Sequence, residues 1–178
     1  MIVAAVLMVV GTAGAAETQE PATIRLQLRN EAKVPEDVLD ESRQEVGRIF
    51  ARAGFEVMWT DAAPQLTVKI VLDALGYDRA ASQVMGVAVP AKSGAIVQVF
   101  FRQVWLFART YRVDPGAMLG HVIAHEVGHV LLATHLHSAT GLMRGAWDHA
   151  QMREVARGGL TFTDGQARKI RAAVNHPR

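Results

Sequence analysis

Apolar and polar residues alternate near the start of the chain, in the segment ATIRLQLRN at positions 22 to 30. Ile24, Leu26 and Leu28 follow the two-residue period of a half-buried β-strand. Four more short runs rich in apolar and β-branched residues follow before residue 102: FEVMW, LTVKIVLD, MGVAVP and GAIVQVFF, at 55–59, 66–73, 85–90 and 94–101. The first part of the chain is therefore expected to supply about five strands.

Helical periodicity replaces this alternation in several longer segments. Between residues 34 and 54, apolar residues recur along one helical face, acidic residues occupy the first turn, and Pro35 and Gly54 mark the two ends. A second helix is expected over residues 102 to 112. The segment that begins with Asp114 as N-cap and Pro115 as first helical residue predicts a third helix, which runs to about residue 134.

The C-terminal part of the chain predicts a loop over residues 135 to 148 and a short helix in AQMREVARG, at 150–158. The last helix is expected in TDGQARKIRAAV, where Thr163 and Gln166 have the spacing of a capping box. Together these elements predict an α+β fold. A mixed, twisted sheet of about five strands packs on the helix of residues 35 to 53 and on the helix after Asp114.

The first sixteen residues have the pattern of a secretory signal peptide. An unbroken apolar stretch from Ile2 to Val10 is followed by small residues up to Ala16, although no Lys or Arg precedes it. The stretch is too short to span a bilayer comfortably as a retained anchor. We expect cleavage near Ala15 or Ala16, a secreted or periplasmic domain over residues 22 to 178, and no stable membrane span after cleavage.

Composition narrows the chemistry of this domain. Half of the 178 residues are apolar, enough for the core of a single domain, and the net charge of +2 comes from scattered basic residues. No footprint of nucleic-acid binding is therefore visible. The chain has no cysteine, which removes thiolate ligands, a Cys nucleophile and a redox role. Patterns for a serine hydrolase or a nucleotide-binding loop are also missing.

Five histidines fall within the stretch HVIAHEVGHVLLATHLHSATGLM, at residues 121 to 143. His125 and His129 are four residues apart on the predicted helix, so both rings point towards one spot and can share a metal ion. Glu126 is rotated by about 100° from His125, which keeps it out of the ligand set but near a metal-bound water. The pattern predicts a zinc site in which Glu126 is the general base.

The remaining histidines of this region are weighed by their position. His135 and His137 follow where the helix should stop, and either can be the third ligand. His121 continues the helical face by one more turn, and a straight helix does not easily aim three such residues at one ion. It is therefore expected to be packed or solvated. His149 is expected in a surface turn.

The stretch resembles the signature of the metzincin zinc metallopeptidases, His-Glu-x-x-His-x-x-Gly-x-x-His followed by a Met-containing turn. The pattern maps onto His125, Glu126, His129, His135 and Met143, about a fifth of the chain. The resemblance implies a Zn²⁺-dependent peptidase that acts on peptide or protein substrates, with Met143 in the Met-turn beneath the metal. Extended substrates would then add to an exposed strand edge, supplied by residues 85–90 or 94–101.

The chain departs from the signature at two positions. Leu132 stands where the family has Gly, so a helix that continues to Ala133 or Thr134 would displace the turn and favour His137 as the third ligand. Gly145 stands where the family frequently has Tyr. Two other functions stay open: a zinc hydrolase acting on something other than peptides, and a catalytically silent, zinc-stabilised secreted binding module with a closed site.

Overall fold

The structure is a computed structural model that describes residues 21–73, 84–91 and 94–175. The predicted signal peptide lies outside these residues. Among the described residues, no helix is both long and apolar enough to cross a membrane. The elements follow one another as β1 (Ala22–Asn30), α1 (Glu36–Arg52), β2 (Phe55–Trp59), β3 (Leu66–Val71), β4 (Gly86–Ala91), β5 (Gly94–Phe100), α2 (Phe101–Tyr111), α3 (Pro115–Leu131), α4 (His149–Ala156) and α5 (Asp164–Asn175).

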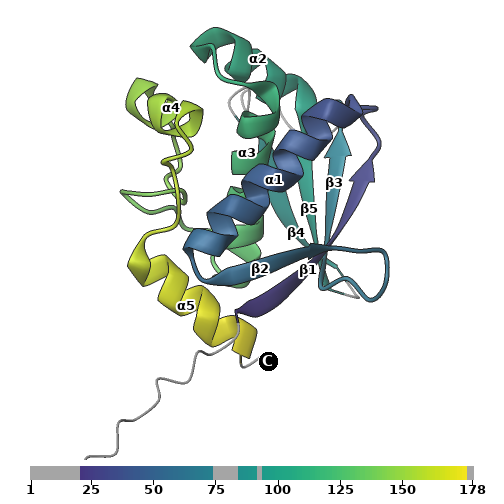
Figure 1. Cartoon of the computed structure of the whole chain (residues 1–178), viewed down its shortest axis with the longest axis vertical. Helices are drawn as coiled ribbons and strands as arrows, with labels where there is room; N and C mark the ends of the chain where they lie inside the picture. Colours follow the sequence, from purple (N-terminus) through teal and green to yellow (C-terminus); the bar gives the residue numbers. More distant parts are fainter. Residues whose placement is uncertain (1–20, 74–83, 92–93, 176–178) are drawn as a thin grey trace, which may run out of the picture.

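The predicted α+β fold with a mixed sheet is confirmed (Figure 1). The five strands have the order β2-β1-β3-β5-β4. β2, β1, β3 and β5 run parallel to one another. β4 pairs with β5 in antiparallel register, with Ala88 opposite Val97. β4 is therefore an edge strand and β5 is internal. Of the two strands considered as an exposed edge for substrates, residues 94–101 are excluded because β3 and β4 pair with both sides of β5.

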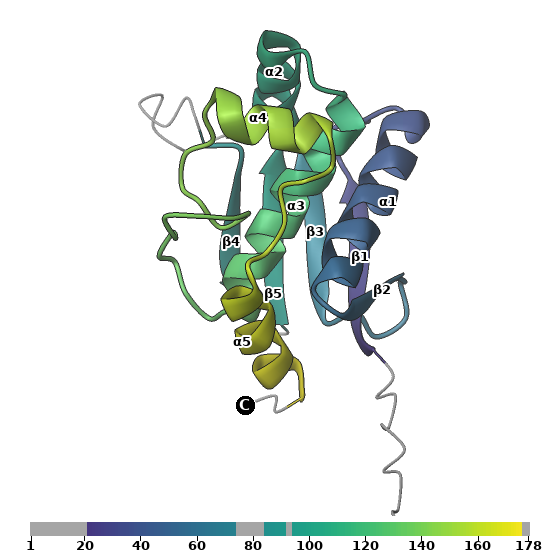
Figure 2. The ribbon, with the colours of Figure 1, turned by 60° about the vertical axis from the view of Figure 1, so that its left-hand side comes forward.

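Helices α1 and α3 lie side by side over one face of the sheet (Figures 1 and 2). Their close approach depends on glycines of α3, because a Cβ atom at Gly120 would lie 2.7 Å from the Cβ atom of Glu45. The core between these layers consists of alternate strand residues and the apolar faces of both helices, among them Leu26, Val68, Ile70, Val97, Ile49, Phe50, Leu119 and Ile123. This packing holds the histidine-bearing helix rigidly against the sheet.

The predicted helix starts are confirmed by their hydrogen bonds. The Asp114 carboxylate accepts from the backbone N–H of Ala117 at 2.9 Å, with Pro115 at the first helical position. Thr163 and Gln166 cap each other reciprocally at 2.9 and 3.3 Å. Two sequence predictions were less accurate: α3 ends at Leu131, before residue 134, and His149 opens helix α4 instead of lying in a turn.

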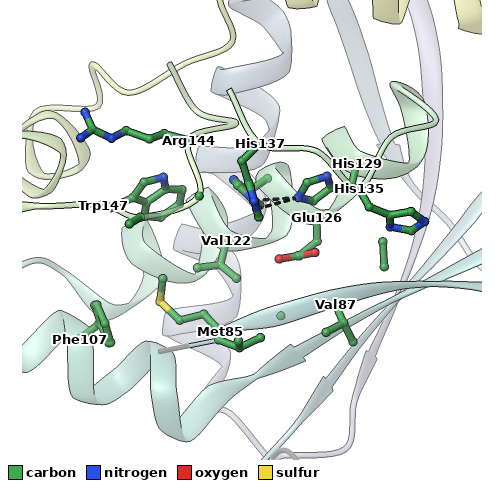
Figure 3. Close-up of a pocket in the computed structure, with 16 residues that line it drawn as sticks. Met85, Val87, Phe107, Val122, Glu126, His129, His135, His137, Arg144 and Trp147 are labelled. Carbon is green, nitrogen blue, oxygen red and sulfur yellow. Dashed lines mark hydrogen bonds between the residues drawn. The ribbon is translucent and has the colours of Figure 1, made fainter. Parts of the chain in front are cut away.

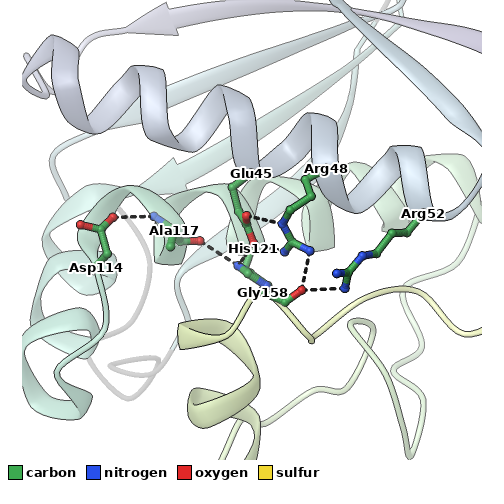
Figure 4. Close-up of polar contacts among 7 residues, drawn as sticks. All are labelled: Glu45, Arg48, Arg52, Asp114, Ala117, His121 and Gly158. Carbon is green, nitrogen blue, oxygen red and sulfur yellow. Dashed lines mark hydrogen bonds and ion pairs between the residues drawn. The ribbon is translucent and has the colours of Figure 1, made fainter.

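A partly buried polar cluster joins α1, α3 and the segment after α4 (Figure 4). Arg48 makes a two-point ion pair with the buried Glu45, and both Arg48 and Arg52 donate to the Gly158 carbonyl. His121 is fully buried in this cluster, where its Nδ1 donates to the Ala117 carbonyl at 2.8 Å. Burial lowers its pKa. His121 is thus a packed residue, as its spacing predicted.

Candidate metal centre

Three histidine rings converge at the C-terminal half of α3 (Figure 3). The Nε2 atom of His129 lies 3.1 Å from Nε2 of His125 and 3.3 Å from Nε2 of His137. These three side chains form a group whose ligand atoms all lie within 4.8 Å of one another. A tetrahedral Zn²⁺ with Zn–N distances of about 2.0–2.1 Å requires N···N separations of roughly 3.3 Å. The two separations at His129, 3.1 and 3.3 Å, are close to this value.

Backbone carbonyls fix the orientation of the two helical histidines. His125 Nδ1 lies 2.8 Å from the Leu142 oxygen, and His129 Nδ1 lies 2.8 Å from the Thr134 oxygen. Because a carbonyl oxygen only accepts, each Nδ1 carries the proton, and each neutral ring presents a lone pair at Nε2. Two lone pairs that face each other at 3.1 Å repel, whereas a cation between them is bound by both.

The environment keeps these rings neutral. Burial lowers the pKa of His125 to about 4, and it also lowers the pKa of His129. A histidine must be deprotonated to ligate a metal, so both rings are ready to bind at neutral pH. The residues present therefore fit a divalent cation such as Zn²⁺.

The end of α3 decides which later histidine joins the pair. Ala133 has a left-handed φ of 48°, and its N–H donates to the Val130 carbonyl at 3.1 Å, while the N–H of Thr134 donates to the His129 carbonyl at 3.2 Å. This is a complete Schellman motif with Ala at the position usually taken by Gly. The chain leaves the helix at Ala133, one residue after the Gly of the metzincin signature.

This displaced turn brings His137 to the other two rings. His135 instead lies at the edge of the neighbouring cavity, exposed and outside the group of three. Thr134, in the same turn, supplies the carbonyl that orients His129. The helix end thus both positions the third histidine and fixes the second.

Replacing Ala133 with Gly should stabilise the protein by about 1 kcal/mol. A left-handed conformation costs an L-residue roughly 1–2 kcal/mol, and Gly avoids this cost at the expense of a more flexible unfolded chain. Urea denaturation with an unchanged m-value measures the difference. As a control, Ala172→Gly on the exposed face of α5 should have the opposite sign, because Gly weakens a helix interior. A destabilised Ala133→Gly protein would contradict the assigned turn.

Met143 packs against Gly128, in the turn of α3 that carries His125 and His129. Its side chain is 1% exposed, and a Cβ atom at Gly128 would lie 2.6 Å from its sulfur. Its backbone carbonyl accepts from Ser138, and the preceding residue, Leu142, supplies the carbonyl that holds His125. Gly128 was not singled out in the sequence, yet it makes the packing of Met143 possible.

Gly145 makes room for His137. A Cβ atom at Gly145 would lie 2.8 Å from Cγ and 2.9 Å from Nδ1 of the His137 ring. Any side chain at this position would have to displace the ring from the group. The ring of His137 packs against the backbone at Gly145, which leaves no space for a larger side chain there.

Glu126 projects between the histidines and β4 (Figure 3). The residue is 8% exposed, and it approaches β4 so closely that a Cβ atom at Gly86 would lie 2.7 Å from its Cγ atom. Burial raises the pKa of Glu126 to about 7. A carboxyl group with a pKa near neutrality is well suited to take up and release a proton. A glycine inside a strand pattern is a signal of close approach, and it could have identified Gly86.

A cavity of about 430 Å³ opens beside the histidines, between α3, β4 and the segment after His137. Trp147, which the sequence analysis did not single out, closes one side, with its ring edge-on to His125 at a centroid distance of 5.6 Å. The other lining residues are Val84, Met85, Gly86, Val87, Ala88, Phe107, Val122, Glu126, His129, His135, His137, Arg144, Gly145 and Ala146. The histidines and Glu126 thus face a space that can hold a substrate.

The raised pKa of Glu126 predicts that the free energy of unfolding of the metal-free protein depends on pH. The pKa rises from 4.5 in the unfolded chain to about 7 in the fold. Between these values the folded state holds a proton that the unfolded state has lost. Stability should therefore fall by roughly 3 kcal/mol from this group as the pH rises through that window, and stay lower above it.

Glu126→Gln should remove this loss. Urea denaturation of both metal-free proteins at about pH 5 and about pH 8 should show that the variant gains stability relative to the wild type at the higher pH. The comparison isolates Glu126, because the buried histidines affect both proteins alike. An equal difference at the two pH values would contradict the shifted pKa.

Compared with known proteins, the chain matches no family model and no curated protein sequence.

Proposed function

We propose that this protein is a zinc-dependent hydrolase of peptide bonds. The observation that carries the proposal is the pair of histidine Nε2 atoms 3.1 Å apart, with the Nε2 atom of His137 beside them. Nε2 of His125 and of His129 carries no proton, because each neutral ring holds its proton on Nδ1, which donates to a carbonyl. A buried carboxyl group, Glu126, faces the same cavity. This combination matches an open zinc site with a general base.

The proposed roles follow from the chemistry of each side chain. His125, His129 and His137 would hold the ion, which when bound supplies a Lewis acid and a water of lowered pKa. Glu126 would serve as the general base and acid, holding a proton at its carboxylate and releasing it to the leaving amine. With a cation bound at the histidines, the pKa of Glu126 would be lower than its metal-free value, since a nearby opposite charge favours the carboxylate.

The edge strand supports a peptide as substrate. β4 pairs only with β5 in the described sheet, and Met85 to Ala88 line the cavity opposite the histidines. An extended peptide can add to such an edge through main-chain hydrogen bonds, while its side chains enter pockets on either side. This edge strand and Glu126 line the same cavity. A peptide on β4 would therefore carry its backbone across the reactive groups.

The number of clustered ligands favours an enzyme over a silent binding module. Structural zinc sites are usually closed by four protein ligands, whereas catalytic sites keep one position open. Within the part of the chain that the structure describes, the group contains three histidines, and His135 lies outside it. Burial of Glu126 also disfavours its charged form, and a purely structural zinc site does not need a buried carboxyl group beside the ligands.

The decisive experiment combines metal analysis with a cleavage assay. The purified protein should contain zinc, cleave a denatured generic protein, lose this activity with a chelator and regain it when zinc is restored. Small ester and amide substrates, tested in parallel, distinguish a peptidase from another zinc hydrolase. Zinc binding without hydrolysis of any of these substrates would favour the binding module instead.

A further inference from the structure

Helix α2 exposes apolar and basic side chains on one face. At 100° per residue, Arg102, Trp105, Leu106 and Arg109 fall within about 100° of one another. Trp105 is 39% and Leu106 46% exposed, whereas Val104 on the inner face is fully buried. We call these four outward residues the outer face of α2. The helix stands at one end of the molecule, far from the C-terminus (Figures 1 and 2).

A third exposed apolar side chain lies beside this face. Leu72 is 49% exposed, and its carbonyl accepts from the backbone N–H of Arg102 at 3.0 Å, which places it next to the start of α2. Single exposed apolar residues are ordinary on a soluble protein, but a group of large ones beside each other marks an interaction surface.

The charge of this surface is positive. The guanidinium of Arg109 lies 4.6 Å from the centroid of the Trp105 ring, and Arg102 is paired with Asp73. Helix α2 contains no acidic residue, and Arg112 follows it directly. Within the described ranges, no acidic side chain lies within ion-pair distance of Arg109 or Arg112. Both cations are thus available to an anionic partner.

We propose that the outer face of α2 docks the protein on an anionic lipid bilayer. Trp and Leu side chains partition into the headgroup region of a bilayer, and neighbouring arginines bind lipid phosphates. A planar membrane suits a single helix face at the extremity of a molecule. Phe107, which lines the cavity, points away from the outer face, so docking leaves the cavity free. The proposal is independent of the zinc chemistry.

Sedimentation with vesicles tests this proposal on the full chain. Binding should be strong to phosphatidylcholine vesicles that contain phosphatidylglycerol and weak to phosphatidylcholine alone. The double variant Trp105→Ser, Leu106→Ser should bind at least roughly tenfold more weakly. In the double variant Arg109→Gln, Arg112→Gln, the affinity for these vesicles should fall by a factor of roughly five for each arginine removed. Most of the dependence of binding on salt concentration should also be lost.

A matched control is Met58→Ser on β2, the edge strand opposite β4. Met58 is 48% exposed, which is close to the 46% of Leu106. This variant should bind vesicles as the wild type does. All variants share residues 1 to 20, so any contribution from that segment cancels. The emission of Trp105, identified by its loss in Trp105→Phe, should shift to the blue on binding.

Several outcomes would overturn the proposal. Equal binding by the wild type and both double variants would assign any vesicle affinity to another segment. Binding that does not depend on phosphatidylglycerol would remove the role of the arginines. Self-association of the wild type in sedimentation velocity, lost in the Trp105→Ser, Leu106→Ser variant and without vesicle binding, would show a second copy as the partner. Hydrolysis of a soluble substrate should be unchanged in both double variants, whatever the outcome for vesicles.

Discussion

Replacing Glu126 with Gln should lower the rate of peptide hydrolysis by roughly a thousandfold or more while zinc binding is retained. Gln has nearly the same shape, so it still fits between α3 and the backbone of Gly86. It cannot take a proton from water or return one to the leaving amine. Steady-state kinetics on a peptide substrate, with metal analysis of the same sample, measures both effects.

The same substitution at an exposed glutamate distinguishes the loss of the general base from the loss of one negative charge. Glu56→Gln alters an exposed carboxylate on β2, at the sheet edge opposite β4, and should leave the rate unchanged. Should the Glu126→Gln protein keep most of its activity with zinc bound, the general-base role would be wrong. Loss of zinc from that variant would instead place Glu126 among the ligands.

Replacing His137 with Ala should weaken zinc binding by well over about a hundredfold. An open zinc site has three protein ligands, so no other side chain can replace the one that is lost. The expected loss of affinity is larger than the loss caused by changing a residue that only hydrogen-bonds to a ligand. His135→Ala should change the affinity far less, since its ring lies outside the group of three. Competition with a zinc-binding dye gives both affinities.

The two histidine variants also control for each other. Both remove an exposed imidazole from the same loop, so a difference between them reports on ligation and not on the loop as a whole. Equal and complete loss of zinc in both would indicate a closed site with four histidines, and the binding module would replace the enzyme. A larger loss with His135→Ala would return the third ligand to the position of the metzincin signature.

Much of the fold is local in origin, and the sequence predicts it for that reason. Strand periodicity, the Asp114 cap and the Thr163–Gln166 capping box all depend on neighbours a few residues apart. The order of the strands does not. Which strand becomes the edge depends on pairings between distant segments, and only the fold places β4 outside β5.

The candidate site divides in the same way. A spacing of four residues on a helix brings His125 and His129 to one side whatever surrounds them, and it sets Glu126 beside them. The sequence by itself therefore determined this pair of candidate ligands and the candidate base. It also determined that a turn after the helix decides the third ligand.

Only the tertiary structure placed His137, and not His135, beside His125 and His129. This placement depends on how the chain leaves α3, which it does through Ala133, a residue with no intrinsic preference for the left-handed conformation that it adopts. Packing of Met143 on Gly128 and of the His137 ring on Gly145 fixes the following loop. These contacts join residues far apart on the helix and the loop. The spacing of residues in the sequence determines which side chains lie together on one helix. Where a loop returns onto that helix depends on the side-chain packing between the two, which the spacing does not determine.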